Sequence, residues 1–321
     1  MNFQDEQIIR TWAGQRPQPA TLLLAREEGA VGRLLAQFCD RLKALMPALR
    51  VKTAADETFR APALIIGPHR NIAYQAIPEG PELPPFLAAL AGVAEGGAEL
   101  PPEFADWSAR MELPAELTLY ITMQCPHCPK AVGQLLALAA ATPKIRMAVV
   151  DGRLFDAQAA GHGIRSVPTL LLEDQLRWSG TIDVVEVIRQ CLQRDPSRLS
   201  AASLRQILEA GDAPRAAAMM IARGAIFPAL LPLLTHERWS VRLGAMVAVE
   251  YLADEAPALV TQLVDPLWEK FGSLPESVQG DVVQVLGQVQ GDAATRCLHT
   301  IAAGHYAADV KEAAVEELEN R

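Results

Sequence analysis

The chain has 321 residues and a formal net charge of -9, with 50% hydrophobic, 21% charged and 5% aromatic residues. This length exceeds what one hydrophobic core usually serves, so we expect two or three domains, and the composition is typical of a folded globular protein. The acidic balance and the lack of any Lys/Arg run argue against a nucleic-acid partner, because phosphate binding needs a basic face.

The first residues do not form the pattern of a secretory signal. Asp5 and Glu6 stand where a signal peptide needs basic residues, and no later segment reaches the roughly 18 consecutive apolar residues of a membrane span. We therefore expect a cytoplasmic protein with no membrane partner.

The first strand signals begin at residue 21. "TLLLA" (21–25) predicts a strand, "AVGRLLA" (30–36) a helix and "LRVKT" (49–53) a second strand. A proline then opens the strand "RAPALIIG" (60–67), and residues 70–92 predict a further short strand and a closing helix. This order describes one α/β unit.

The same pattern recurs about one hundred residues later. "AVGQLLA" (131–137) repeats residues 30–36, and "SVPTLLLE" (166–173) repeats residues 60–67. Strand signals again flank the helix, "LTLYITM" before it and "IRMAVV" after it. We therefore predict two α/β units in tandem, over 1–98 and 99–195, with a connector between them that has one helix of its own.

Strand signals stop after about residue 195. Three amphipathic segments align on Ser240-Val241, Ser277-Val278 and Asp309-Val310, and a helix pair that recurs every 30 to 40 residues is typical of an α-solenoid. The segment "WSVRLGAMVAVEYL" resembles the second helix of HEAT repeats. The predicted fold class is thus α/β plus all-α, with a HEAT-like helical repeat domain over 196–321.

Cys125-Pro126-His127-Cys128 is the pattern with the clearest chemistry. At a strand-to-helix junction this spacing predicts that Cys125 lies in the first helical turn, near unpaired N–H groups and the positive end of the helix dipole, with Pro126 in the same turn. Such cysteines commonly have a pKa lowered to roughly 3.5–7.5, and a protonated His127 would stabilise the thiolate further. We expect Cys125 to attack and Cys128 to resolve.

Two other interpretations of this pair remain open, a zinc half-site and inert thiols. A structural zinc needs four ligands, and the sequence holds no second Cys/His pair at the required spacing. The remaining cysteines lie in apolar helical patterns, where a small core residue is the usual role; they are Cys39, Cys191 and Cys297.

The C-x-x-C pair, with "GIRSVPT" following 40 residues later, resembles the thioredoxin superfamily. This resemblance implies that the Val167-Pro168 bond is cis, that Pro168 lies beside the cysteines, and that Val167 presents its backbone to a bound peptide. The phrase "CPHCP" with residues 149–174 resembles in particular the N-terminal domain of the flavoprotein alkyl hydroperoxide reductase and the archaeal protein disulfide oxidoreductases.

The resemblance also has departures. In the first unit, Leu24 and Glu27 stand where the cysteines would be, and Ala61-Pro62 stands where the cis proline would be, so that unit is expected to have an architectural or docking role. No G-x-G-x-x-G motif appears, so we expect no bound cofactor or metal and a redox-active disulfide supplied with electrons by another protein.

These observations lead to the hypothesis of a glutaredoxin- or thioredoxin-like thiol-disulfide oxidoreductase acting in cell redox homeostasis. By resemblance, its partners would be protein thiols and disulfides, with a thioredoxin reductase as donor and a peroxiredoxin as acceptor, and an unknown protein bound at the helical repeats. The alternative is a redox-sensing scaffold in which the solenoid binds a partner. Asp151 ends a strand beside the helix, where assistance of proton transfer to Cys128 is one role, but a strand-end Asp is usually a turn cap and this is the role we expect. His162 is expected to be a surface turn residue rather than a proton shuttle.

Overall fold

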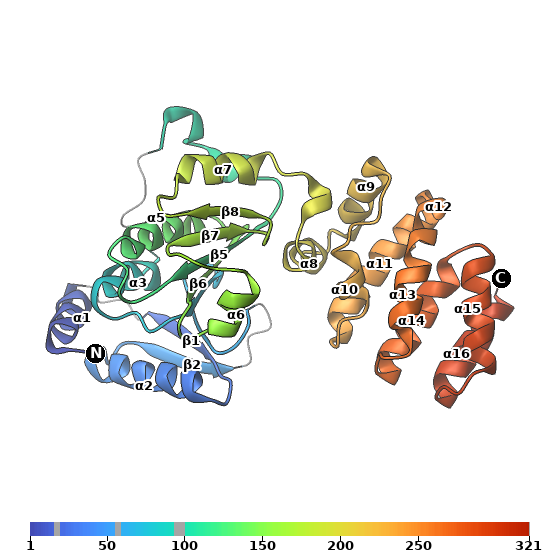
Figure 1. Cartoon of the computed structure of the whole chain (residues 1–321), viewed down its shortest axis with the longest axis horizontal. Coiled ribbons are helices and arrows are strands. Elements are labelled where there is room, and N and C mark those ends of the chain that lie inside the picture. Colours follow the sequence, from blue (N-terminus) through green and yellow to red (C-terminus); the bar gives the residue numbers. More distant parts are fainter. Residues whose placement is uncertain (16–19, 55–58, 93–99, 321) are drawn as a thin grey trace. The chain divides into compact units, whose positions relative to one another are not determined.

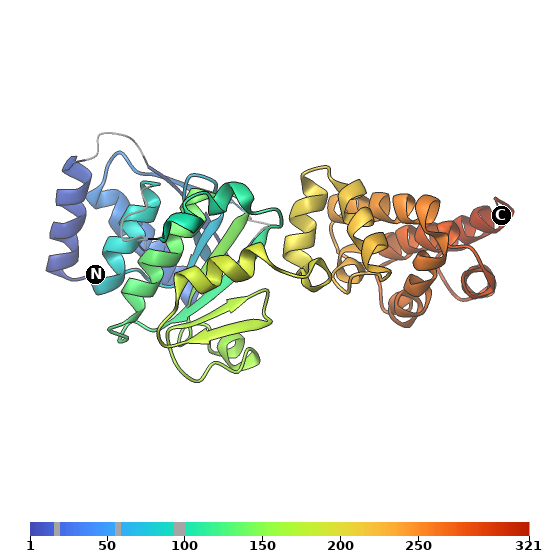
Figure 2. The same ribbon diagram turned by 90° about the horizontal axis from the view of Figure 1, so that it is seen from above.

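The computed structural model describes residues 1–15, 20–54, 59–92 and 100–320. Two compact units divide the chain, Met1–Gln193 and Arg194–Arg321. Figures 1 and 2 show that the strands belong to the first unit, coloured blue to yellow-green, whereas the segments from yellow to red are helical.

One mixed sheet of eight strands forms the centre of the first unit, in the order β2-β1-β3-β4-β6-β5-β7-β8. The strands are β1 (Thr21–Ala25), β2 (Arg50–Ala54), β3 (Ala63–Ile66), β4 (Ile72–Gln75), β5 (Ala115–Ile121), β6 (Ile145–Asp151), β7 (Thr169–Leu172) and β8 (Leu176–Ser179). Most of them are short apolar runs whose residues are largely buried.

The two halves of this sheet have the same topology. In the first half, β1 pairs in parallel with β2 and antiparallel with β3, which pairs antiparallel with β4. In the second half, β5, β6, β7 and β8 repeat these relations. The parallel pair β4 and β6, in register from Ile72 with Met147, joins the halves into one sheet.

Helices cover mainly one face of the sheet. They are α1 (Phe3–Gln15), α2 (Ala30–Leu45), α3 (Leu83–Leu90), α4 (Trp107–Arg110), α5 (Cys128–Ala141), α6 (Asp156–Gly161) and α7 (Val184–Leu192), with the 3-10 turns η1 (Gly80–Glu82) and η2 (Pro102–Phe104). One apolar cluster contains side chains from α2, α3, α5 and α7 together with alternate residues of the strands, such as Leu22 and Leu119. A smaller cluster around Tyr120 lies on the other face and includes Ala159 of α6.

Three of these elements correct or extend the sequence interpretation. α1 and α6 have no counterpart in the predicted order of elements. The predicted connector contains η2 and α4, while its residues 95–99 lie outside the described part of the chain.

Asn71 ties the two halves together at their junction. Its side chain is buried, and Nδ2 lies 2.7, 3.1 and 2.6 Å from the carbonyl oxygens of Ala139, Thr142 and Ile145. These carbonyls belong to the end of α5 and the start of β6. A residue that immediately precedes β4 thus satisfies backbone groups that follow the redox helix of the other half.

The second unit contains no strand among its described residues. Its helices are α8 (Ala201–Glu209), α9 (Ala213–Arg223), α10 (Leu230–Leu234), α11 (Trp239–Glu255), α12 (Pro257–Val260), α13 (Val264–Phe271), α14 (Glu276–Gln288), α15 (Asp292–Ala303) and α16 (Ala308–Glu319), with the 3-10 turns η3 (Pro196–Arg198) and η4 (Thr261–Leu263). α11 packs against α14, and α14 against α16. The three residues aligned in the sequence, Val241, Val278 and Val310, are all buried.

A buried ion pair links α11 to α14 in this unit. Arg242 is only 3% exposed and pairs with Asp281, while its Nη1 donates to the carbonyls of His236 and Glu237 at 2.7 and 2.8 Å. Such a buried guanidinium needs this full set of acceptors. The pair therefore fixes the packing of neighbouring helices.

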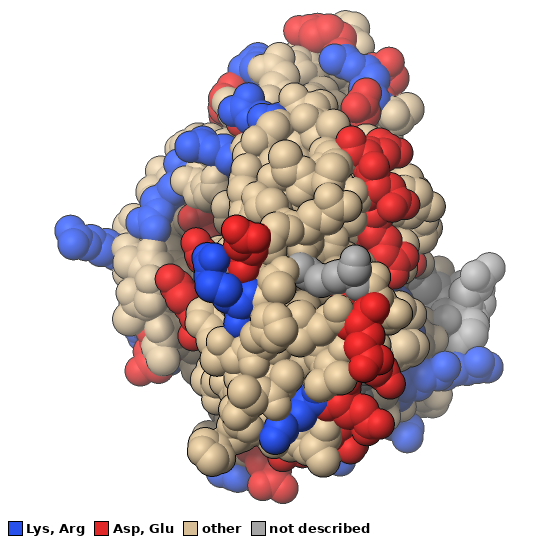
Figure 3. Space-filling view, turned by 90° about the vertical axis from the view of Figure 1, so that its right-hand side faces the viewer, with Lys and Arg blue, Asp and Glu red and all other residues tan. Residues whose placement is uncertain are grey.

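The surface of the helical unit is uneven in charge. Figure 3 shows acidic side chains gathered along one side of an area without charged side chains. Among the described residues, no helix is both long and apolar enough to cross a membrane.

Candidate redox site

The two cysteines lie where β5 leads into α5, and a disulfide joins them. Cys128 is completely buried, whereas Cys125 is partly exposed. A partner sulfur can therefore reach Cys125 but not Cys128, and this difference in access distinguishes an attacking thiol from a resolving one.

The helix begins later than the sequence predicted. α5 starts at Cys128, with His127 as its N-cap and Pro129 in its first turn, so Cys125 and Pro126 precede the helix. The prediction that both lie in the first turn was wrong, because Pro129, which has no N–H group, takes that place.

The prediction that the start of α5 stabilises a Cys125 thiolate does not depend on the residue at which the helix begins. The Cys128 N–H group, one of the unpaired groups at the helix start, donates to the Cys125 sulfur at 3.1 Å. This N–H group and the positive end of α5 are the two features from which the sequence predicted a stabilised Cys125 thiolate.

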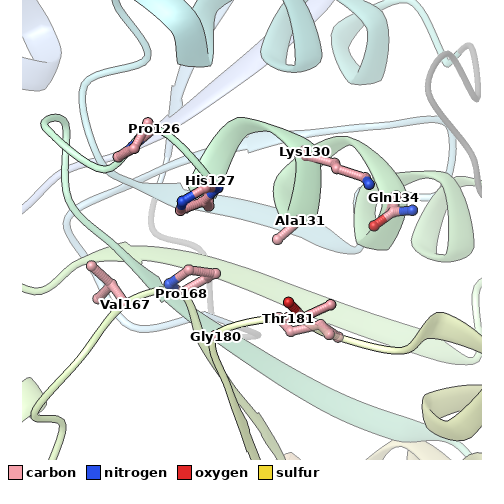
Figure 4. Close-up of a pocket in the computed structure, with 10 residues that line it drawn as sticks. Pro126, His127, Lys130, Ala131, Gln134, Val167, Pro168, Gly180 and Thr181 are labelled. Atoms are coloured by element: carbon pink, nitrogen blue, oxygen red, sulfur yellow. The ribbon is translucent and has the colours of Figure 1, made fainter.

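The loop before β7 forms the opposite side of the site. The Val167-Pro168 bond is cis, as the resemblance implied, and the Val167 carbonyl oxygen lies 3.8 Å from the Cys125 sulfur. Figure 4 shows Val167 and Pro168 across a groove from Pro126 and His127. The Gly180 N–H group donates to the Pro168 carbonyl at 2.9 Å and links this loop to the end of β8.

Glu82 is a residue of this site that the sequence interpretation missed. It is 2% exposed, it belongs to η1, and η1 packs against α5, whose first residue is Cys128. Neither of its carboxyl oxygens has a hydrogen-bond partner among the described residues. Burial, and then the nearby Asp151 carboxylate, raise the pKa of Glu82 to about 7.

The sequence signal for Glu82 was present but weak. "EGPELPPF" places an acidic residue before an apolar helix, which by pattern alone is an ordinary helix start. Only the packing of η1 against α5 brings this turn next to the helix that begins at Cys128.

Asp151 has the role that the sequence predicted, whereas His162 has a contact that the sequence did not predict. Asp151 is buried, and its Oδ1 accepts from the Arg153 N–H group at 2.8 Å, which confirms a turn cap. His162 is more than a surface turn residue, because its Nδ1 lies 2.7 Å from the hydroxyl of the fully buried Tyr120. Burial is the main cause that raises the pKa of Tyr120 to about 12.

The corresponding region of the first half has no thiols. Leu24 is buried in β1, Glu27 is exposed before α2, and the Ala61-Pro62 bond is cis. Among the described residues, no cluster of three or more His, Cys, Asp or Glu side chains could hold a metal ion.

The remaining cysteines are core residues, as predicted. Cys39, Cys191 and Cys297 are buried and form no disulfide. Burial is the main cause that raises the pKa of Cys39 to about 12 and also raises the pKa of Cys297. A buried thiol is out of reach of a partner disulfide, so these three do not compete with Cys125.

Residues 116–193 match the family model described as a thioredoxin domain. This segment contains the cysteine pair and the cis proline. Together with the sheet topology, the match defines a domain of thioredoxin fold that carries a C-x-x-C disulfide.

Known relatives extend the similarity to most of the first unit. The chain is 25% identical over 220 residues to the F component of alkyl hydroperoxide reductase from Pseudomonas aeruginosa, covering 66% of this chain and 42% of that protein. It is 26% identical over 156 residues to an NADH dehydrogenase of Ferdinandcohnia aciditolerans, covering 48% of this chain and 30% of that protein. The chain therefore spans less than half the length of these relatives.

Two solved structures share the fold of the first unit. The NTD_N/C domain of alkylhydroperoxide reductase AhpF from Enterococcus faecalis has a TM-score of 0.50 at 19% identity, covering 60% of this chain and 99% of that chain. A protein disulfide oxidoreductase from Aeropyrum pernix has a TM-score of 0.50 at 14% identity, covering 63% and 96% respectively.

Proposed function

We propose that this chain is a protein thiol-disulfide oxidoreductase in which Cys125 is the nucleophile and Cys128 the resolving thiol. The observation that carries the proposal is the joint position of three groups: a partly exposed Cys125 sulfur, a buried Cys128 bonded to it, and the Val167-Pro168 loop facing both. Val167 and Pro168 would dock the partner segment, and Pro126 and His127 would tune the reactivity of the pair.

The reaction starts from the reduced pair and a disulfide in a partner protein. The Cys125 thiolate attacks one partner sulfur, the partner disulfide breaks, and the other partner sulfur leaves as a thiolate. Cys128, once deprotonated, attacks the Cys125 sulfur, which releases the second partner thiol and forms the Cys125-Cys128 disulfide. Two electrons have then moved from this chain to the partner, and the reverse sequence would oxidise a dithiol.

Glu82 is the proposed acceptor of the Cys128 proton. Cys128 is buried and needs a base before it can attack, and the buried carboxyl group in η1 has a pKa raised to about 7. A base of that pKa both accepts and returns a proton near neutral pH. In a Glu82→Gln variant, decay of the mixed disulfide should slow by about 10- to 100-fold; an unchanged decay rate would exclude this role.

At the level of domains, we propose two thioredoxin-like units, 1–98 and 99–195, followed by HEAT-like repeats over 196–321. The repeated strand order and the aligned buried valines of α11, α14 and α16 support this division. Because the matched relatives include the F component of alkyl hydroperoxide reductase, we propose a peroxiredoxin as acceptor and a thioredoxin reductase as donor.

The helical unit would dock a protein partner. α11 exposes Trp239, Leu243 and Tyr251 along one side, at 59%, 40% and 40%. The same surface also supports the second candidate function, a scaffold whose affinity for a partner changes with the redox state of Cys125 and Cys128.

Two experiments test the proposed function. A Cys128→Ser variant should trap several thiol proteins through Cys125, whereas a redox-sensing scaffold should trap none and change its affinity for one protein on oxidation. The reduction potential of the pair gives the direction of the reaction: about -230 mV or below indicates a reductant, and a value above about -180 mV an oxidant or isomerase. If no disulfide forms between the two cysteines in that range, the proposal is wrong.

A further inference from the structure

The groove beside the redox pair holds polar groups that the exchange reaction does not use. Its volume is about 380 Å³, and it runs between the start of α5 and the segments that contain Pro168 and Thr181. Figure 4 shows Lys130 and Gln134 next to each other on α5, with Thr181 on the opposite wall. Gln134 is four positions after Lys130, so the two side chains lie one above the other on the same face of the helix.

These three side chains are hydrogen-bond donors without acceptors. Among the described residues, the Lys130 ammonium, the Gln134 amide and the Thr181 hydroxyl form no side-chain hydrogen bond, and Lys130 forms no ion pair. An ammonium, an amide N–H and a hydroxyl are all able to donate to the same kind of group, a carboxylate.

The charge of the groove is opposite to that of the whole chain. No Asp or Glu lines it, Lys130 is its permanent cation, and the His127 ring adds positive charge whenever it is protonated. The formal net charge of the chain is nevertheless -9. A local positive site in an acidic protein orients acidic segments toward that site and repels them elsewhere.

Two acidic residues that follow Thr181 in the sequence have partners on α7 itself. The Asp183 carboxylate accepts from the N–H groups of Val185 and Glu186 at the start of α7, at 2.9 and 3.4 Å. Glu186 itself pairs with Arg189. Neither carboxylate forms an ion pair with Lys130.

We infer that the groove selects a partner segment that carries an acidic side chain next to its reactive cysteine, with Lys130 as the residue that determines this specificity. The inference rests on the proposed function, because the segment enters the groove when its disulfide reaches Cys125. The partner cysteine lies at the Val167-Pro168 end, and the acidic side chain at the Lys130, Gln134 and Thr181 end.

The experiment uses the full reduced chain and three synthetic peptides, each bearing one cysteine in a mixed disulfide with thionitrobenzoate. The peptides differ only in the residues on both sides of the cysteine, which are Glu, Gln or Lys. The Cys125 thiolate attacks the peptide sulfur, the coloured thionitrobenzoate anion leaves, and Cys128 then displaces the peptide thiol as the protein disulfide forms. Absorbance of the released anion gives the rate constant for each peptide.

The expected order of rate constants is Glu, then Gln, then Lys, with about a threefold step between neighbours, the size typical of a solvent-exposed ion pair. Lys130→Gln should abolish the preference for Glu over Gln, and Lys130→Glu should reverse the order of Glu and Lys. The matched control is Lys43→Gln on α2, an equal change of net charge at an exposed lysine outside the groove, and it should keep the wild-type order. High salt should reduce the steps.

The failures of the two proposals are distinguishable. Equal rates for the three peptides in the wild-type chain would overturn the inference and leave the proposed function standing. A preference retained in Lys130→Gln would overturn the role of Lys130. If no peptide reacts although a small aromatic disulfide oxidises the pair, the proposed function itself is wrong. The mixed disulfide of glutathione with thionitrobenzoate is the small-molecule comparison. If Lys130→Gln slows the reaction of that compound and not the reactions of the peptides, the inference that the groove selects a protein segment is also wrong.

Discussion

The two halves of the first unit share a backbone plan but differ in chemistry. Both have the same strand order, and both have a cis proline before their third strand. At the exit of the first strand, however, one half has Leu24 and Glu27, and the other has Cys125 and Cys128. Repetition of the fold therefore does not repeat the reaction, which depends on two side chains at one junction.

The half without the C-x-x-C pair still contributes residues that pack against α5 of the other half. Glu82 of η1 packs toward α5, and Asn71 holds the far end of the same helix. Residues of α2 and Met123, two positions before Cys125, line a cavity of about 580 Å³. The two halves thus divide the tasks, with the C-x-x-C pair in one half and supporting groups in the other.

The sharpest test of this comparison removes a thiol. Cys125→Ser should lower the rate of disulfide exchange by at least about a thousandfold, because a hydroxyl is a far weaker nucleophile than a thiolate. The rate can be measured with the thionitrobenzoate peptides. The matched control is Glu27→Ser, at the exposed counterpart of Cys128 in the first half, and it should change the rate by less than about twofold. A large effect of Glu27→Ser would contradict the division of tasks.

Glu82 should make stability fall as pH rises. Its pKa is about 7 in the folded chain against an ordinary value of 4.5. Between these values the folded chain keeps a proton that the unfolded chain has lost, so the free energy of unfolding decreases with rising pH by about 3 kcal/mol, and the loss then persists above pH 7.

Glu82→Gln should remove this decrease, since neither oxygen of the native carboxyl group has a hydrogen-bond partner among the described residues. Urea unfolding of the oxidised protein at about pH 5 and about pH 8 measures the difference. Glu28→Gln, at an exposed carboxylate of the same half, is the control. An equal pH dependence in wild type and Glu82→Gln would show that Glu82 is not the group responsible.

Asn71 should stabilise the junction of the halves. Asn71→Ala removes a donor close to three carbonyl oxygens and should lower the free energy of unfolding by about 2 kcal/mol, the usual result of leaving buried acceptors unpaired. Urea unfolding measures the change. His69→Ala, in the exposed turn just before it, should have little effect. Similar losses in the two variants would mean that Asn71 does not join the halves.

Two buried tyrosines provide the smallest expected effect. Tyr120→Phe removes the hydroxyl that contacts His162 and should lower the free energy of unfolding by about 1 kcal/mol, with a higher KM and unchanged kcat because the loop before Pro168 is less firmly held. Tyr74→Phe removes a hydroxyl that has no hydrogen-bond partner in the described structure, and should lose no stability. Equal effects of the two substitutions would contradict the positioning role of His162.

The sequence predicted most strands because they are short apolar runs between turn residues, such as "TLLLA" and "IRMAVV". It also singled out Cys125 and Cys128, because two cysteines three positions apart at a strand-to-helix junction, without a second ligand pair, favour a disulfide over a zinc site. α6 was missed because it has only six residues, too few to show helical periodicity.

The supporting groups could not be predicted in the same way. Glu82 lies 46 residues before Cys128, and Tyr120 and His162 are 42 residues apart, so only the packed fold brings each pair of regions together. The start of α5 was misplaced by three residues because each of Pro126 and Pro129 is compatible with a first helical turn.

The contact of Asn71 with the end of α5 has a consequence for how this chain tolerates change. The first half has no catalytic thiol, and its sequence would therefore be expected to vary freely. However, the Asn71 side chain bonds to the end of α5, and η1, which contains Glu82, packs against the same helix. Substitutions in the first half are therefore limited by these contacts with the second half. If the second half were excised as a separate module, it would lose both the Asn71 bonds and the packing of η1.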